Sequence, residues 1–131
     1  MKKLGILNQQ LSAIVAAMGH TDLLVVADAG LPVPPGVPCV DLAVVAGLPP
    51  FIDVVLAIAA ELEVEELTVA DELLARDETL PASLRTAFPG ARFNHLSHEE
   101  LKRLTTRARA IVRTGECTPY NNVVLAAGVT F

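Results

Sequence analysis

The sequence predicts an α/β fold: a single three-layer domain over residues 1–131, in which a central β-sheet is flanked by helices. Three observations lead to this prediction. Short apolar runs with β-branched residues alternate along the chain with segments of helical periodicity. Hydrophobic residues make up 52% of the chain and aromatic residues only 4%, so Val, Leu, Ile and Ala fill the interior, as in a sheet covered on both faces. A length of 131 residues is about that of one domain.

The first predicted helix ends next to a histidine. Asn8 is a suitable N-cap, and apolar residues recur at helical spacing from Leu11 to Met18. Gly19 follows where a helix would stop. The helix therefore places His20 just beyond its carboxyl end.

A buried strand comes next, and an aspartate ends it. The apolar run 23–27 contains two valines and is short enough for a strand, and Asp28 follows it directly. Ser97 and Glu100 form a capping-box pattern for the last helix. The apolar run from Val123 to Phe131 predicts burial in the sheet or against a second subunit. The remaining predicted elements are a proline-rich loop at 32–38, strands at 40–45, 64–69, 91–96, 110–112 and 123–127, and helices at 51–62, 71–75 and 82–87.

Composition excludes several classes of partner. The net charge of −5 offers no general attraction to a polyanion, and the basic residues between 102 and 113 have no interleaved aromatics. We therefore expect no nucleic-acid partner. The chain contains no phosphate-binding loop, dinucleotide fingerprint or metal-spaced set of ligands, so we expect neither a cofactor nor a metal.

The sequence also predicts a cytoplasmic protein without a membrane segment. Lys2 and Lys3 resemble the start of a signal peptide, but the apolar stretch after them is interrupted at 8–10 and is too short for one. No uninterrupted apolar run approaches the roughly 18 residues of a membrane span. Cys39 and Cys117 lack metal-ligand or redox spacing, as expected of reduced thiols.

Two candidates for acid-base chemistry flank the first strand. Histidine is the side chain best matched to proton transfer near neutral pH, which makes His20 a candidate catalyst, although it could instead cap the helix. Asp28 could meet a ligand at the carboxyl end of the strand, or accept turn hydrogen bonds before Gly30. In this arrangement a small polyhydroxylated ligand could meet both groups.

A second polar cluster, at 113–122, precedes the last strand. Its end offers neutral donors and acceptors that suit sugar hydroxyls, although the same residues could be a half-buried aromatic and two turn residues. Glu116 could be a second carboxylate, but a surface charge is the favoured interpretation. The candidates in this cluster are Tyr120, Asn121 and Asn122.

The other two histidines are less informative. His98 begins the last helix beside Glu99, where an exposed polar residue is the favoured interpretation, and His95 has no evident task. Together, the two polar clusters predict acid-base chemistry on a neutral sugar.

The chain resembles the D-ribose pyranase family, which groups with the fucose mutarotases. The resemblance runs from end to end and is unspecific only between about Asp71 and Asn94. After Asp28, the segment Ala29–Pro32 is similar to the ribose branch rather than the fucose branch. The matching segments are Met1–Lys3, Gly5–Asn8, Met18–Asp22, Ala27–Pro32, Val40–Ala43, Ser97–Glu100, Arg113–Glu116, Thr118–Tyr120, Asn122 and Ala127–Phe131.

The resemblance implies an isomerase that interconverts the β-pyranose and β-furanose forms of D-ribose. It also implies a homo-oligomer, a decamer of two stacked pentameric rings, whose sites are completed by neighbouring subunits. Asn121 departs from the family, which more often has alanine there, so sugar preference could differ. The alternatives are a mutarotase for fucose or another monosaccharide, and a non-catalytic sugar-binding partner of a transporter. The implied site residues are His20 as catalytic acid, with Asp28, His98, Tyr120, Asn122 and the backbone of Asn121 holding the sugar.

Overall fold

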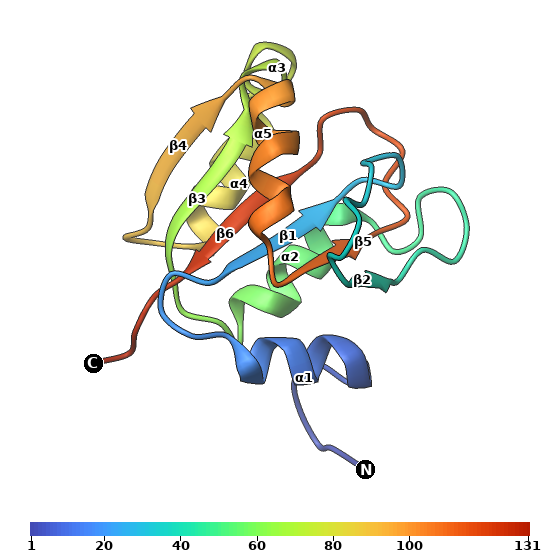
Figure 1. Ribbon diagram of the computed structural model, residues 1–131, viewed down its shortest axis with the longest axis vertical. Coiled ribbons are helices and arrows are strands. Elements are labelled where there is room, and N and C mark those ends of the chain that lie inside the picture. The colour runs from blue at the N-terminus through green and yellow to red at the C-terminus, as the bar shows by residue number, and fades with distance from the viewer.

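One mixed six-stranded sheet organises the chain, in a computed structural model that describes residues 1–131 (Figure 1). The strand order across the sheet is β2-β5-β1-β6-β3-β4. β6 lies between β1 and β3 and is antiparallel to both, whereas all other neighbours are parallel. The strands are β1 (Leu23–Ala27), β2 (Cys39–Asp41), β3 (Val64–Ala70), β4 (Arg92–Leu96), β5 (Ala110–Arg113) and β6 (Val123–Ala127).

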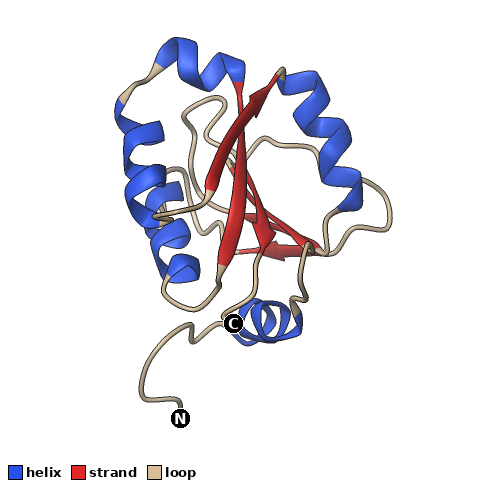
Figure 2. Cartoon of the chain, turned by 90° about the vertical axis from the view of Figure 1, so that its left-hand side faces the viewer, coloured by secondary structure: helices blue, strands red, loops and turns tan.

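Helices cover both faces of this sheet (Figure 2). The predicted α/β class, with a central sheet flanked by helices, is therefore confirmed. None of the helices combines the length and the hydropathy that a membrane crossing requires. The helices are α1 (Gln9–Ala17), α2 (Phe51–Ala59), α3 (Asp71–Arg76), α4 (Thr79–Ala87) and α5 (His98–Leu104), followed by a 3₁₀ turn at Thr105–Arg107.

Successive side chains of β1 point alternately into two hydrophobic cores, one on each face of the sheet. Leu24 and Val26 point into the larger one, which α1, α2 and α4 cover. Val25 and Ala27 point into the smaller one, against Leu101 of α5. Successive strand residues face opposite sides of a sheet, so a continuous apolar run is what a strand covered on both faces requires.

Local signals account for the starts of α1 and α5. The side chain of Asn8 accepts a hydrogen bond from the backbone N–H of Leu11 at 2.9 Å, which confirms it as the N-cap of α1. Ser97 and Glu100 form the predicted capping box at the start of α5.

Two predicted elements are shorter than expected. The strand predicted at 40–45 ends at Asp41, because the carboxylate of Asp41 accepts from the N–H of Ala43 at 3.0 Å and turns the chain. The helix predicted at 51–62 ends at Ala59. Conversely, α4 begins at Thr79 rather than 82, where Asp77 accepts from the N–H of Thr79 at 2.8 Å.

The ends of the strands form two chemically different edges of the sheet. One, called here the carboxyl edge, lies at the carboxyl ends of β1, β2 and β5, and the other lies at their amino ends. β1, β2 and β5 run parallel and end at the same edge, which is also where the antiparallel β6 begins. Asp28 therefore meets the segment before Val123 at this edge, and α5 starts here after β4. His20 precedes β1 and lies at the opposite edge.

Candidate functional site

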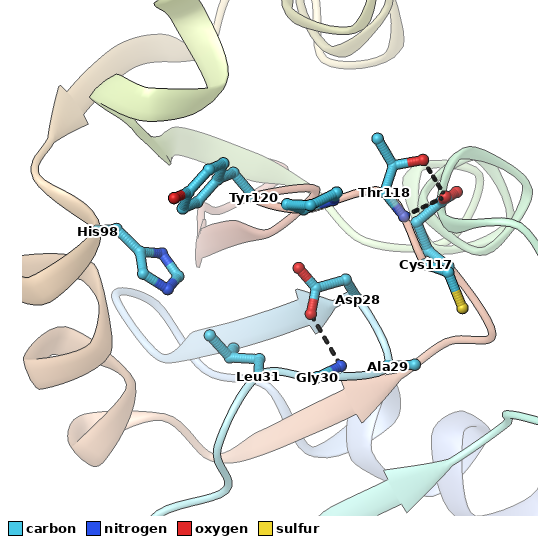
Figure 3. A pocket seen from close by; sticks show the side chains of 10 residues that line it. Asp28, Ala29, Gly30, Leu31, His98, Cys117, Thr118 and Tyr120 are labelled. Atoms are coloured by element: carbon cyan, nitrogen blue, oxygen red, sulfur yellow. Dashed lines mark hydrogen bonds between the residues drawn. The ribbon is translucent and has the colours of Figure 1, made fainter. Parts of the chain in front are cut away.

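A cavity of about 530 Å³ opens at the carboxyl edge of the sheet (Figure 3). Its volume lies within the roughly 300–1,000 Å³ typical of small-molecule sites. Three of the predicted site residues, Asp28, His98 and Tyr120, converge on it from β1, α5 and the loop before β6. The lining residues are Asp28, Ala29, Gly30, Leu31, His98, Glu116, Cys117, Thr118, Pro119 and Tyr120.

The carboxylate of Asp28 is held in a fixed orientation. Its Oδ1 accepts from the N–H of Gly30 at 3.0 Å, and its Oδ2 accepts from Nδ2 of Asn122 at 3.0 Å. The backbone N–H of Asp28 donates to Oδ1 of Asn122 at 2.8 Å. Asp28 thus accepts a turn hydrogen bond and also faces the cavity, so both interpretations of this residue hold. Asn122 is fully buried and supports Asp28 from behind the cavity.

His98 and Tyr120 form one wall of the cavity. Their rings meet edge to face, with centroids 5.1 Å apart and planes at 80°. The backbone N–H of His98 donates to Oε2 of Glu72 at 2.9 Å, which fixes the start of α5. Nδ1 of His98 is buried and has no hydrogen-bond partner in the protein. Such an atom is normally paired, so His98 has an unsatisfied hydrogen-bonding nitrogen in this wall.

Tyr120 adopts a backbone conformation that non-glycine residues rarely take. Its φ of 68° lies in the left-handed region. The loop is held in place by a hydrogen bond from the N–H of Asn122 to the carbonyl of Tyr120 at 2.8 Å. Left-handed residues of this kind cluster at functional sites, where surrounding contacts impose them.

The side chain of Asn121 is directed away from the cavity. It is buried, and its Oδ1 accepts from Nη2 of Arg76 in α3 at 2.6 Å. Only the backbone of Asn121 therefore remains available to a ligand in the loop before β6. Sequence reasoning missed Arg76, because nothing near it in the sequence points to residue 121.

Glu116 is a structural brace and not the surface charge favoured by the sequence. Its Oε1 accepts from the N–H and the hydroxyl of Thr118 at 3.0 and 2.7 Å, and its Oε2 accepts from the N–H of Phe51 at 3.3 Å. Burial acts to raise the pKa of this carboxyl, but the hydrogen bonds from Thr118, Phe51 and Cys117 together outweigh it and lower the pKa. The Glu-x-Thr spacing was a local signal that could have indicated this role.

His20 lies far from the cavity of its own chain. Seven residues lie between it and Asp28, and five of them form β1, which is roughly 16 Å long at about 3.3 Å per residue, so the two residues lie at opposite ends of this strand. Nε2 of His20 lies 2.9 Å from Oε2 of Glu65. The expectation that one small ligand could meet both His20 and Asp28 is not met within a single chain. A site that contains both groups needs a second copy of the chain.

The model of the RbsD / FucU transport protein family matches residues 1–130. The chain belongs to this family. Among its curated relatives, D-ribose pyranases from Symbiobacterium thermophilum and Paracidovorax citrulli are 54% and 52% identical over 131 residues, with complete coverage of each chain. The resemblance stated from the sequence is therefore confirmed.

Solved structures of RbsD / FucU proteins match the whole chain. Bacillus subtilis RbsD, solved in complex with D-ribose, has a TM-score of 0.95 and 49% identity, with complete coverage of both chains. A fucose mutarotase from Streptococcus pneumoniae, solved with L-fucose, has a TM-score of 0.83 at 21% identity, again with complete coverage of both chains. The second match shows the shared fold.

In this RbsD / FucU protein, the cavity suits a neutral polyol. Asp28, Glu116, Thr118 and Tyr120 supply hydrogen-bonding groups, and Leu31 and Pro119 supply apolar walls. No lysine or arginine lines the cavity, and the carboxylates of Asp28 and Glu116 in its lining would repel a phosphate group. The lining therefore favours a free sugar over a phosphorylated one.

Proposed function

We propose that this protein is a D-ribose pyranase, an isomerase that interconverts the β-pyranose and β-furanose forms of D-ribose. The observation that carries the proposal is the cavity at the carboxyl edge, which presents a carboxylate, an imidazole and a phenol and is lined by no lysine or arginine. The full-length identity of 54% to a protein named D-ribose pyranase supports the same conclusion.

The reaction consists of balanced proton transfers. An acid protonates the ring oxygen of the pyranose as the bond from this oxygen to the anomeric carbon breaks, and a base removes the proton of the anomeric hydroxyl to leave the open-chain aldehyde. The hydroxyl that closes the furanose ring then attacks the anomeric carbon, returns its proton to the original acid, and the base reprotonates the anomeric oxygen. Each positioned proton transfer contributes about 10²- to 10⁴-fold in rate.

We assign His20 as the acid and Asp28 as the base. Asp28 faces the cavity with a carboxylate already oriented by Gly30 and Asn122. His98 and Tyr120 hold the sugar, and so does the backbone of Asn121. Asn122 acts through Asp28, because its carboxamide is buried against that residue.

A neighbouring copy of the chain supplies His20 to the cavity in this proposal. The surface includes an apolar hollow of about 530 Å³ between the start of α1, α2 and the loop after β2. Leu7, Val44 and Leu48 line it and remain 65%, 71% and 52% exposed, an extent of apolar surface that subunit contacts would cover. We extend the proposal to the decamer of two stacked pentameric rings.

We also place the enzyme in the cytoplasm, in ribose catabolism. Cys39 and Cys117 are both free thiols, as is usual in a reducing compartment.

The deciding experiment is NMR saturation transfer between the pyranose and furanose anomeric protons of D-ribose, with and without catalytic amounts of the protein. Accelerated exchange supports the pyranase. The same measurement on L-fucose is the specificity control, and faster exchange there than on ribose would indicate a fucose mutarotase. Ribose binding without acceleration would indicate a sugar-binding partner instead.

A further inference from the structure

The pairing of β3 with β6 contains one irregularity, and it falls on Glu65. Val64 pairs with Ala127 and Glu66 pairs with Ala126, so Glu65 is the extra residue of a β-bulge. A bulge of this kind bends the strand locally and redirects a side chain, and bulges are frequent next to active sites. A Cβ placed on Gly128 would lie only 3.2 Å from the Cβ of Glu65, so β6 packs closely against the bulge.

The loop that carries His20 is attached to the same end of β6. Thr21 has a φ of 69°, a left-handed conformation that is costly for a β-branched residue. Its N–H donates to the carbonyl of Ala127 at 2.8 Å, and the N–H of Ala127 donates to the carbonyl of Asp22 at 2.9 Å. The side chain of Asp22 also accepts from Nε of Arg109 at 2.9 Å. Two irregular backbone segments thus meet at Ala127.

These segments bring one imidazole and one carboxylate into contact. Oε2 of Glu65 lies 2.9 Å from Nε2 of His20, and the ring of His20 makes no other hydrogen bond in the chain. An ionised carboxylate can only accept a hydrogen bond, so the proton resides on Nε2. Nδ1 is left free.

We propose that Glu65 is the positioning residue for His20: it keeps the proton on Nε2 and thereby makes Nδ1 the nitrogen that exchanges a proton with the sugar. This inference rests on the proposed catalytic role of His20 and gives that residue a partner within its own chain.

The pairing suits a reversible proton transfer. When Nδ1–H gives its proton to the ring oxygen, the lone pair left on Nδ1 can accept the proton of the hydroxyl that closes the other ring. Nε2–H remains bonded to Glu65 in both steps, so the carboxylate stabilises the imidazolium without itself being protonated. Without Glu65, neutral His20 could carry its proton on either nitrogen.

The test compares Glu65→Gln and Glu65→Ala with Glu66→Gln as the matched control. Glu66 is the next residue of the strand and pairs with Arg92 at 2.9 Å, so the control also removes one carboxylate from an ion pair. Two quantities are measured: the ribose exchange rate, and the ¹⁵N chemical shifts of the His20 ring at about pH 8, where imidazole is neutral. With only three histidines, the His20 signals are identified by their loss in His20→Ala.

We expect the unaltered protein and Glu66→Gln to show the proton on Nε2 and full exchange. Both Glu65 variants should show a mixture of tautomers and an exchange kcat reduced by about 10- to 100-fold, with KM for ribose unchanged. If the unaltered protein accelerates exchange and Glu65→Gln is equally active, the positioning role is wrong while the pyranase proposal survives. Unchanged His20 shifts in both Glu65 variants would also overturn it. If the unaltered protein does not accelerate exchange, both proposals fall.

Discussion

Asn122 and Asp28 hold each other through two hydrogen bonds, although 94 residues separate them in the sequence. Nδ2 of Asn122 donates to Oδ2 of Asp28 at 3.0 Å, while Oδ1 of Asn122 accepts from the backbone N–H of Asp28 at 2.8 Å. The start of β6 thereby fixes the group that ends β1. A fully buried amide thus sets the direction of the cavity's central carboxylate.

Asn122→Asp should disrupt this pair, because a carboxylate oxygen would replace the N–H donor that faces Oδ2 of Asp28. We expect the free energy of unfolding to fall by about 1–3 kcal/mol, and kcat/KM for ribose exchange to fall more than about tenfold. Urea unfolding and NMR exchange measure the two effects. Asn94→Asp, on the exposed face of β4, is the control and should change neither. Native activity in Asn122→Asp would contradict the supporting role of this residue.

His20→Ala should abolish most of the exchange and leave ribose binding measurable by calorimetry. The expected loss is about 10²- to 10⁴-fold, the usual contribution of a positioned acid. His95→Ala is the control, because His95 lies on β4, pairs with Asp71 of α3 and does not line the cavity. Full exchange by His20→Ala would remove this residue from the mechanism.

Mixing two inactive variants tests whether the site is shared between copies. His20→Ala and Asp28→Asn alter opposite edges of the sheet, so a shared site can regain both native groups when subunits are exchanged. After unfolding and refolding together in equal amounts, about a quarter of the sites should be native, with activity to match. A mixture as inactive as its components would place both groups of each site in one chain.

His98→Asn should weaken ribose binding without altering the pH dependence of kcat. Nδ1 of His98 is buried and unpaired in the protein, and a hydrogen bond to the sugar would satisfy it. We expect KM to rise about tenfold, the effect of one lost hydrogen bond. The measurement is kcat of the variant as a function of pH. If the fall in kcat on the acidic or the basic side of the native profile is missing in the variant, His98 takes part in a proton transfer.

Glu116→Gln should reduce stability in a pH-dependent way. The pKa of Glu116 is lowered in the folded protein, so its contribution is fully present above the usual value of 4.5 and is lost as the pH falls through its folded value. The native protein should therefore unfold at higher urea than the variant at neutral pH, and the difference should disappear in acid. A difference that persists unchanged at low pH would mean that the carboxylate charge is not responsible.

The helices and strands were predictable where the signal is local. Asn8 and Ser97 cap helices through contacts three residues away, and the apolar run of β1 is complete within five residues. The end of β2 was not predictable in this way, because the valines after Asp41 suggest a longer strand. β2 ends there because Asp41 forms a turn with Ala43 and because the carboxylate of Asp41 accepts from Nη1 of Arg113 in β5 at 2.7 Å.

The same distinction between local signals and long-range contacts applies to the candidate site. Asp28 and Tyr120 could be named because each lies next to a predicted strand, whereas His98 was named as a site residue only through the family resemblance. The partners of His20 and Asn121 could not be named: Glu65 and Arg76 each act on a residue 45 positions away. Glu65 looks like an ordinary charge in the sequence, and only the pairing of β3 with β6 reveals the bulge that redirects it.

The central place of β6 also has a consequence for how the protein is made. The strand that joins β2-β5-β1 to β3-β4 is β6, which comes after the other five strands of the sheet in the chain. Until it emerges from the ribosome, β1 and β3 each present an unpaired edge, and such edges readily pair with other chains. The sheet is therefore completed only after β6 itself has been synthesised. A chain cut short before Val123 would be left with two exposed half-sheets, a strong candidate for aggregation and for removal by proteases.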